Sequence, residues 1–66
     1  MVNNNLSEIR KDKGLTQEGL AEKSGVSRVT IANIERGAAT NLKISTMLSL
    51  ANALGATVEE IFYLDS

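Results

Sequence analysis

Apolar residues recur along the chain at the three- and four-residue spacing of amphipathic helices rather than in the alternation typical of strands. These positions together predict one hydrophobic core shared by several short helices, and we expect most of them only to pack. The positions expected to be buried are Leu6, Ile9, Leu15, Leu20, Ala21, Val26, Ile31, Ile34, Ile44, Met47, Leu48, Leu50, Ala51, Leu54, Val58, Ile61 and Phe62.

Polar and small residues divide this pattern into five helices. Glycine accepts the left-handed conformation that ends many helices, and four of the five glycines fall at predicted helix ends, namely Gly14, Gly25, Gly37 and Gly55. The residues expected to cap helix N-termini are Asn5 and Thr57, each with a Glu three residues later, then Thr16, Ser27, and either Asn41 or Lys43. The predicted helices span residues 6–13, 17–24, 28–36, 44–54 and 58–63.

Composition narrows the class of protein. A chain of 66 residues allows one modest core, so we expect a single all-α domain over residues 1–66, with no further unit to sense a small-molecule effector. The chain has no Cys and no His, which excludes disulfides, thiolate or imidazole metal sites, and histidine acid-base catalysis. We therefore expect no metal, no cofactor and no enzymatic activity. The short apolar stretches and the polar residues 3–5 predict no membrane span and no secretory signal, and hence a cytoplasmic protein.

The charge balance is slightly acidic, with a formal net charge of −1, whereas proteins that bind nucleic acid are usually basic. The distribution of charge reduces this conflict, because all 7 Lys and Arg residues lie within residues 1–43 and the charged residues of 44–66 are all acidic. One face of the molecule can therefore meet phosphate groups while the acidic part points elsewhere. Lys11, Lys13 and Lys23 also suit a plain solubilising role.

Residues 16–36 carry the pattern of a helix-turn-helix. The turn around Gly25 is so short that the two helices on either side of it must cross steeply, and the small Ala21 allows their close approach. The residues expected in the seam between these helices are Leu20, Val26, Ile31 and Ile34. On spacing alone, a helix-turn-helix in an unrelated all-α protein is the alternative.

The outward side of the helix over 28–36 favours DNA. If Ile31 and Ile34 point inward, this side contains no acid, because Glu35 lies beside them and needs a cation. The outward residues are Arg28, Val29, Ala32, Asn33 and Arg36. Arg can bind guanine O6 and N7 with two hydrogen bonds, Asn can bind adenine N6 and N7, and a small apolar side chain can contact a thymine methyl.

These features in this order resemble the Cro/repressor helix-turn-helix family of small bacterial and phage transcriptional regulators. The resemblance covers about residues 6 to 62 and rests on Gly14-Leu15-Thr16-Gln17-Glu18, Leu20-Ala21-Glu22-Lys23, Gly25-Val26-Ser27-Arg28, Ile31, Ile34-Glu35-Arg36-Gly37 and Leu50-Ala51-Asn52-Ala53-Leu54-Gly55. It implies a compact five-helix fold of the lambda-repressor type, with room for a short terminal β-ribbon. Two departures are Gly19, where a good helix former is usual, and the loop over 38–42, which lacks the usual proline.

The resemblance also implies roles for individual residues. Bases would be read by Arg28, Val29, Asn33 and the half-buried, more ambiguous Thr30. The DNA backbone would be bound by Gln17, Ser27, Arg36 and Lys43, with backbone N–H groups at the starts of both helices. Arg10 would pair with Glu35 in a largely buried salt bridge, the alternative being a solvated Arg10.

The C-terminal tail is the surface expected to bind a second copy of the chain, because it holds more apolar surface than so small a core can absorb. The residues expected at this interface are Ile61, Phe62, Tyr63 and Leu64. Short family members pair their chain ends as an antiparallel ribbon, which residues 2–4 and 62–64 would allow here. The alternative is that Phe62 fills the core and the tail frays.

The leading hypothesis is a transcriptional regulator, most simply a repressor, that binds a palindromic operator on double-stranded DNA as a homodimer. One helix-turn-helix covers only a few base pairs, and a twofold dimer doubles the site. The alternative is an antitoxin or protein-interaction module that binds a partner protein through its C-terminal tail. An enzyme is the third class, but so short a chain offers no evident place to desolvate a substrate.

Overall fold

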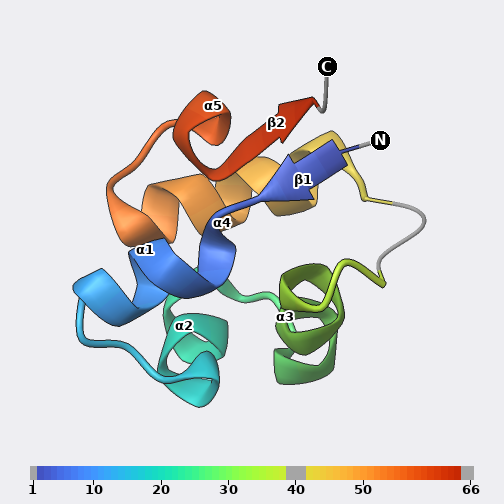
Figure 1. The fold of residues 1–66 in the computed structure, drawn as a ribbon. Coiled ribbons are helices and arrows are strands. Elements are labelled where there is room, and N and C mark those ends of the chain that lie inside the picture. Colours follow the sequence, from blue (N-terminus) through green and yellow to red (C-terminus); the bar gives the residue numbers. More distant parts are fainter. Residues whose placement is uncertain (1, 39–41, 65–66) are drawn as a thin grey trace.

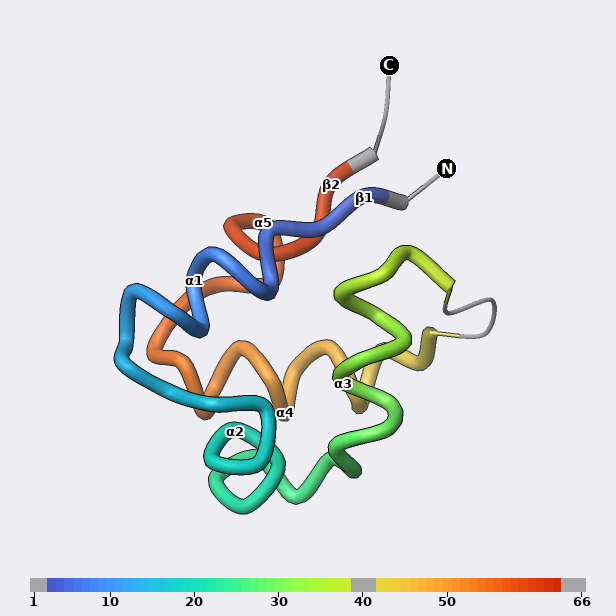
Figure 2. Tube along the Cα trace, turned by 60° about the horizontal axis from the view of Figure 1, so that its bottom comes forward, coloured from blue at the N-terminus to red at the C-terminus, as the bar shows by residue number. Residues whose placement is uncertain are grey.

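Five helices and one two-stranded ribbon form the part of the chain that the structure, a computed structural model, describes, residues 2–38 and 42–64. In chain order the elements are β1 (Val2–Asn4), α1 (Leu6–Asp12), α2 (Gln17–Ser24), α3 (Arg28–Glu35), α4 (Ile44–Leu54), α5 (Val58–Ile61) and β2 (Phe62–Leu64). The prediction of five helices with a terminal ribbon is confirmed. Figures 1 and 2 show β1 and β2 side by side, on the side of the molecule away from α2.

The ends of the helices follow the predicted glycines, all four of which have positive φ. Gly37, with φ of 73°, ends α3 by accepting the left-handed conformation that a side chain would strain. The Gly37 N–H donates to Ile34 O (3.0 Å) and the Ala38 N–H donates to Asn33 O (2.8 Å), which satisfies two carbonyls at the end of the helix. The end of α3 is therefore rigidly defined by backbone hydrogen bonds.

Three of the predicted side-chain caps are confirmed and one is wrong. Thr16 and Ser27 each accept a hydrogen bond from the N–H three residues later, and Thr57 forms a complete capping box with Glu60. Asn5 makes no cap at α1, and the Oδ1 of Asn4 instead accepts from the Leu6 N–H (3.1 Å). Lys43 is the N-cap residue of α4 without a side-chain hydrogen bond, while Asn41 lies outside the described residues.

The predicted helix over 58–63 is too long by two residues. After Ile61 the backbone becomes extended, and β2 pairs antiparallel with β1 in the register Val2↔Leu64, Asn3↔Tyr63 and Asn4↔Phe62. The Asn5 N–H also donates to Ile61 O (2.7 Å). Pairing with the N-terminal segment thus overrides the helical pattern, which local spacing alone did not reveal.

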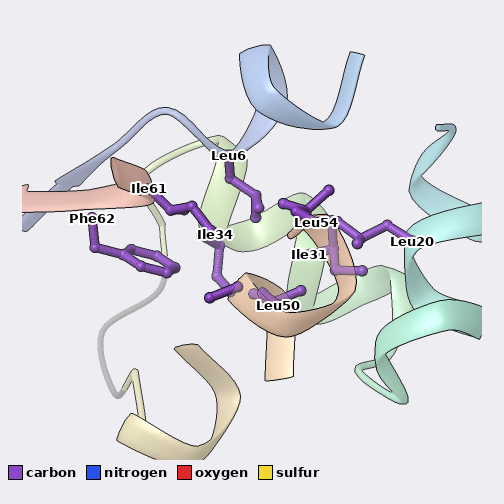
Figure 3. Packing of buried hydrophobic residues seen from close by; sticks show 9 residues of the cluster. Leu6, Leu20, Ile31, Ile34, Leu50, Leu54, Ile61 and Phe62 are labelled. Carbon is purple, nitrogen blue, oxygen red and sulfur yellow. The ribbon is translucent and has the colours of Figure 1, made fainter. Parts of the chain in front are cut away.

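Figure 3 shows the core as a row of side chains that runs from Leu20 on α2 to Phe62 on β2, with Ile34 of α3 between Leu6 and Leu50. The fully or nearly fully buried apolar residues are Leu6, Leu20, Ile31, Ile34, Leu50, Ala51, Leu54, Ile61 and Phe62. Two predictions are wrong, because Ile44 is 67% exposed and Leu48 is 49% exposed. The apolar side of α4 is wider than its contact with the core, and both residues lie at its edge. None of the helices in the described ranges has the length and apolar character needed to cross a lipid bilayer.

Candidate nucleic-acid interface

Packing against α2 sets the orientation of α3. Leu20 of α2 and both isoleucines of α3, Ile31 and Ile34, are buried. Because these two isoleucines lie on one side of the helix, the opposite side of α3 faces solvent, as the spacing predicted. Figure 1 shows α2 and α3 next to each other at the end of the molecule opposite the ribbon.

The outward side of α3 carries the predicted base-reading residues. Arg28 is exposed, and Val29 is 59% exposed, so both side chains are accessible to a ligand. Thr30 and Asn33 are half-buried. The N-cap Ser27 accepts from the Thr30 N–H (3.1 Å) and donates its own hydroxyl hydrogen to Thr30 Oγ1 (2.9 Å), so the start of the helix is well ordered.

At the other end of α3, Arg36 Nη2 donates to Asn33 Oδ1 at 2.6 Å. The two residues are one helical turn apart, and Arg36, the C-cap residue, still has helical backbone angles. The predicted base reader and the predicted phosphate contact therefore hold each other in the free protein. This contact between Asn33 and Arg36 was not predicted from the sequence.

Beneath this surface, Arg10 and Glu35 form the predicted salt bridge, with side-chain exposures of 10% and 8%. Arg10 Nε donates to Glu35 Oε2 (2.7 Å), Nη2 donates to Glu35 Oε1 (3.2 Å), and Nη1 donates to Leu15 O (2.7 Å). Gln17 Nε2 also donates to Glu35 Oε1 (3.1 Å). One carboxylate thus joins α1, the start of α2 and the end of α3.

The environment of Glu35 lowers the pKa of its carboxyl group. Burial acts in the opposite direction and would raise the pKa, but the hydrogen bonds from Arg10 and Gln17 and the charges of Arg10 and Lys11 outweigh it. Glu35 is therefore held as a carboxylate, which keeps the Gln17 amide in a fixed position. The Gln17 side chain is therefore already positioned in the free protein for its predicted contact with the DNA backbone.

A shallow hollow at the starts of α2 and α3 brings Gln17 and Arg28 to one surface. It is lined by Arg10, Thr16, Gln17, Glu18 and Arg28. The first N–H groups of both helices have no partner within the helix and carry partial positive charge, which favours an anion nearby. Lys43 is exposed at the start of α4, and no hydrogen bond or ion pair among the described residues joins it to α3.

The tail does not present the apolar surface that was predicted for dimerisation. Ile61 is fully buried and Phe62 nearly so, because β2 folds back over the core of its own chain. Of the four predicted residues, Tyr63 is exposed, and the side chain of Leu64 lies outside the described residues. Ile61 and Phe62 are therefore not available as the apolar surface that was expected. Phe62 fills the core as the alternative held, but the tail does not fray, because it pairs with β1.

Two further residues matter to the site, and sequence analysis missed one and left the other unexplained. Asn4 Nδ2 donates to Ile34 O (2.8 Å), so β1 is tied to the end of α3; the only signal was a run of asparagines. Gly19 supplies the N–H that donates to the cap Thr16 at the start of α2, and a Cβ added to Gly19 would lie 3.3 Å from Thr16 Oγ1. Glycine there leaves the capping oxygen undisturbed.

Comparison with known proteins agrees with this geometry. The helix-turn-helix family model matches residues 6–61. The chain is 43% identical over 60 residues to the immunity repressor protein of Bacillus phage phi105. The aligned region covers 91% of this chain and 41% of the phage protein. The restriction-modification controller protein C.AhdI from Aeromonas hydrophila is 42% identical, with a TM-score of 0.78 over 83% of this chain and 82% of that one.

A second solved structure, the complex of the SinR protein with the SinI protein, has a TM-score of 0.77 at 33% identity and covers 82% of this chain and 52% of the other. The family match extends over α1 to α5 and includes the whole of α2 and α3. The chain therefore belongs to the helix-turn-helix family of DNA-binding transcriptional regulators, which are not enzymes.

Proposed function

We propose that this protein represses transcription by placing α3 in the major groove of a specific operator. The observation that carries the proposal is the outward side of α3, which holds Arg28, Val29, Asn33 and Arg36 and no acid. In the described ranges, the one ion pair is Arg10–Glu35, so neither Arg28 nor Arg36 is neutralised by a carboxylate. Two guanidinium groups on one exposed helix face, neither in an ion pair with a carboxylate of the described ranges, suit a polyanion.

The dimensions of α3 support this placement. An α-helix with its side chains is about 10–12 Å in diameter, which fits the major groove of B-form DNA, roughly 12 Å wide. Arg28 and Val29 lie at the first turn of α3, the part that enters the groove in helix-turn-helix proteins. We assign base contacts to Arg28, Val29 and Asn33, with Thr30 at the edge of the same face.

Backbone contacts belong to the surface around the start of α2. Gln17 and Arg28 line one hollow at the starts of α2 and α3, where the helix N-termini carry partial positive charge. Ser27 and Arg36 extend this surface along α3, and Lys43 adds a cation at the start of α4. We assign phosphate contacts to these residues. The site of action that this function implies is the cytoplasm.

Selection of bound sites from a random pool of duplex DNA tests the proposal. A short preferred sequence should emerge, and the bound protein should protect its half-site from cleavage by a nuclease. Binding that shows no preference among duplexes, or no preference for duplex DNA over a competing polyanion, contradicts it.

We further propose that two copies bind a palindrome, with their α3 helices about 34–36 Å apart. The surface that supports a dimer is the exposed edge of α4, where Ile44 and Leu48 lie one turn apart. None of the 11 residues of α4 is charged, so two copies can bring this edge together across a twofold axis without repulsion between like charges.

Sedimentation of the wild type and two variants distinguishes this interface from the ribbon. The α4 interface predicts that Leu48→Asp sediments as a monomer, because a charge on an apolar contact must be desolvated, whereas Tyr63→Ser stays dimeric. The reverse result places the contact at the ribbon. A wild type that is monomeric at every concentration contradicts the dimer.

The alternative function, a module that binds a partner protein through its C-terminal tail, has less support. Burial of Ile61 and Phe62 removes the apolar tail on which that hypothesis depended. The complex of SinR with SinI nevertheless places a helix-turn-helix protein in contact with a partner. For this chain, the exposed edge of α4 is the surface on which such a partner would compete with a second copy.

A further inference from the structure

We propose that Arg36 determines sequence specificity by fixing the amide of Asn33, so that Asn33 reads guanine where a free asparagine would read adenine. This inference rests on the proposed function and concerns one position of the half-site. It assigns to Arg36 a positioning role in base recognition, beyond the phosphate contact expected of it.

The orientation of the Asn33 amide follows from the chemistry of its partner. A guanidinium group has only donors, so the Asn33 atom that lies 2.6 Å from Arg36 Nη2 must be the acceptor Oδ1. The bond is charge-assisted, which makes it stronger than a bond between neutral groups. Asn33 Oδ1 therefore already accepts from a cation, and the Nδ2 group points away from it, available to donate.

The backbone keeps the two side chains in register. Asn33 is in the last turn of α3, and Arg36 follows it at the helical spacing of three residues. The hydrogen bonds from Gly37 to Ile34 O and from Ala38 to Asn33 O hold the end of the helix in this form. No carboxylate within the described ranges pairs with Arg36, so nothing there competes with Asn33 for it.

This arrangement changes which base edge fits. To bind adenine with two hydrogen bonds, asparagine donates to N7 and accepts from the N6 amino group through Oδ1. In this protein Oδ1 faces a cation that already donates to it, and the N6 amino group would be a second donor beside a positive charge. Guanine presents acceptors alone at this edge, N7 and O6, and these suit the free Nδ2 donor of Asn33.

Site selection with the wild type and Arg36→Met tests the inference. Methionine keeps the length of the side chain but has no donor. The wild type should prefer guanine at the base pair read by Asn33, which Asn33→Ala identifies as the position where preference is lost. In Arg36→Met the ratio of guanine to adenine affinity at this position should fall by about 5-fold or more.

Two controls separate this role from a simple loss of charge. Lys43→Met removes a cation without touching Asn33, and it should weaken all sites alike and leave the base preference intact. In the Asn33→Ala background, Arg36→Met should cause no further change in preference. Thermal unfolding of each variant verifies that it is folded.

Three results would overturn the inference. They are an adenine preference in the wild type, an unchanged preference in Arg36→Met, or a further shift in the double variant, which would make Arg36 a direct reader. A wild type that selects no sequence at all refutes the proposed function instead, so the two failures are distinguishable.

Discussion

Two arginines hold side chains of α3, Arg10 on its inner side and Arg36 on its outer side, and they differ in burial. Arg10 meets Glu35 where both side chains are about nine-tenths buried, whereas Arg36 meets Asn33 at the surface. The bond lengths are similar, 2.7 Å and 2.6 Å. Burial, and not the geometry of the hydrogen bond, therefore decides what each arginine does.

The inner arginine belongs to the fold. It donates to Leu15 O and to Glu35, which in turn accepts from Gln17, and water cannot replace it without leaving a buried carboxylate without a cation. The outer arginine is readily replaced by water, so it contributes little to folding. What it can control is the set of donors and acceptors that a ligand meets on α3.

The largest expected effect is that of Arg10→Met, which should lower the free energy of unfolding by about 3–5 kcal/mol. Glu35 would then remain buried with Gln17 as its one remaining side-chain donor. Urea unfolding at neutral pH measures the loss. A loss below about 1 kcal/mol would place the pair among exposed salt bridges and remove the contrast with Arg36.

Substitutions on the outer side of α3 should have a smaller effect, which falls on DNA binding. Arg28→Ala and Asn33→Ala should each cost about 1–3 kcal/mol of binding free energy on the preferred site and relax the base preference there. Titration of the selected site and of single-base variants measures both quantities. If both variants keep the wild-type preference, neither residue reads a base.

The inner pair should also make stability depend on pH. Because the pKa of Glu35 is lowered in the folded protein, its contribution is complete above its ordinary value of about 4.5 and is lost as the pH falls through the folded value. Glu35→Gln should therefore show a weaker fall in unfolding midpoint between about pH 5 and about pH 3.

A control variant accounts for the second shifted carboxyl group. The hydrogen bonds from the backbone and side chain of Thr57 lower the pKa of Glu60, so Glu60→Gln removes a separate part of the acid dependence. Equal acid sensitivity in the wild type and in Glu35→Gln would mean that the buried pair does not govern the acid response.

The smallest effects are expected for Arg36→Met. The free energy of unfolding should change by less than about 1 kcal/mol, since the residue is exposed. The slope of log affinity against log salt concentration should decrease by about one unit if Arg36 also contacts a phosphate. A wild-type slope would deny it that contact, and a large loss of stability would show that the two arginines are alike.

Much of this molecule was predictable because the signals are local. The glycines that end α1 to α4, the caps at Thr16, Ser27 and Thr57, and the inward isoleucines of α3 each depend on a few neighbouring residues. The Arg10–Glu35 pair was implied by the family resemblance and is confirmed by the structure. The base and backbone contacts themselves remain predictions.

The errors occur where residues distant in sequence decide the outcome. Helical spacing extended the last helix to residue 63, but pairing with β1 turns Phe62–Leu64 into a strand. Apolar character placed Ile44 and Leu48 in the core, yet the core is already filled by Leu50, Ala51 and Leu54 from the same helix. The role of Asn4 depends on Ile34, thirty positions away along the chain.

The sequence alone determined the five helices, the turn at Gly25 and the acid-free side of α3, because these follow from backbone preferences and from spacing along one helix. Only the tertiary structure decided that Ile61 and Phe62 of the tail are buried, that an edge of α4 is left exposed, and that Glu35 also holds Gln17. These outcomes depend on how a limited core volume is shared among distant segments, which local periodicity does not encode.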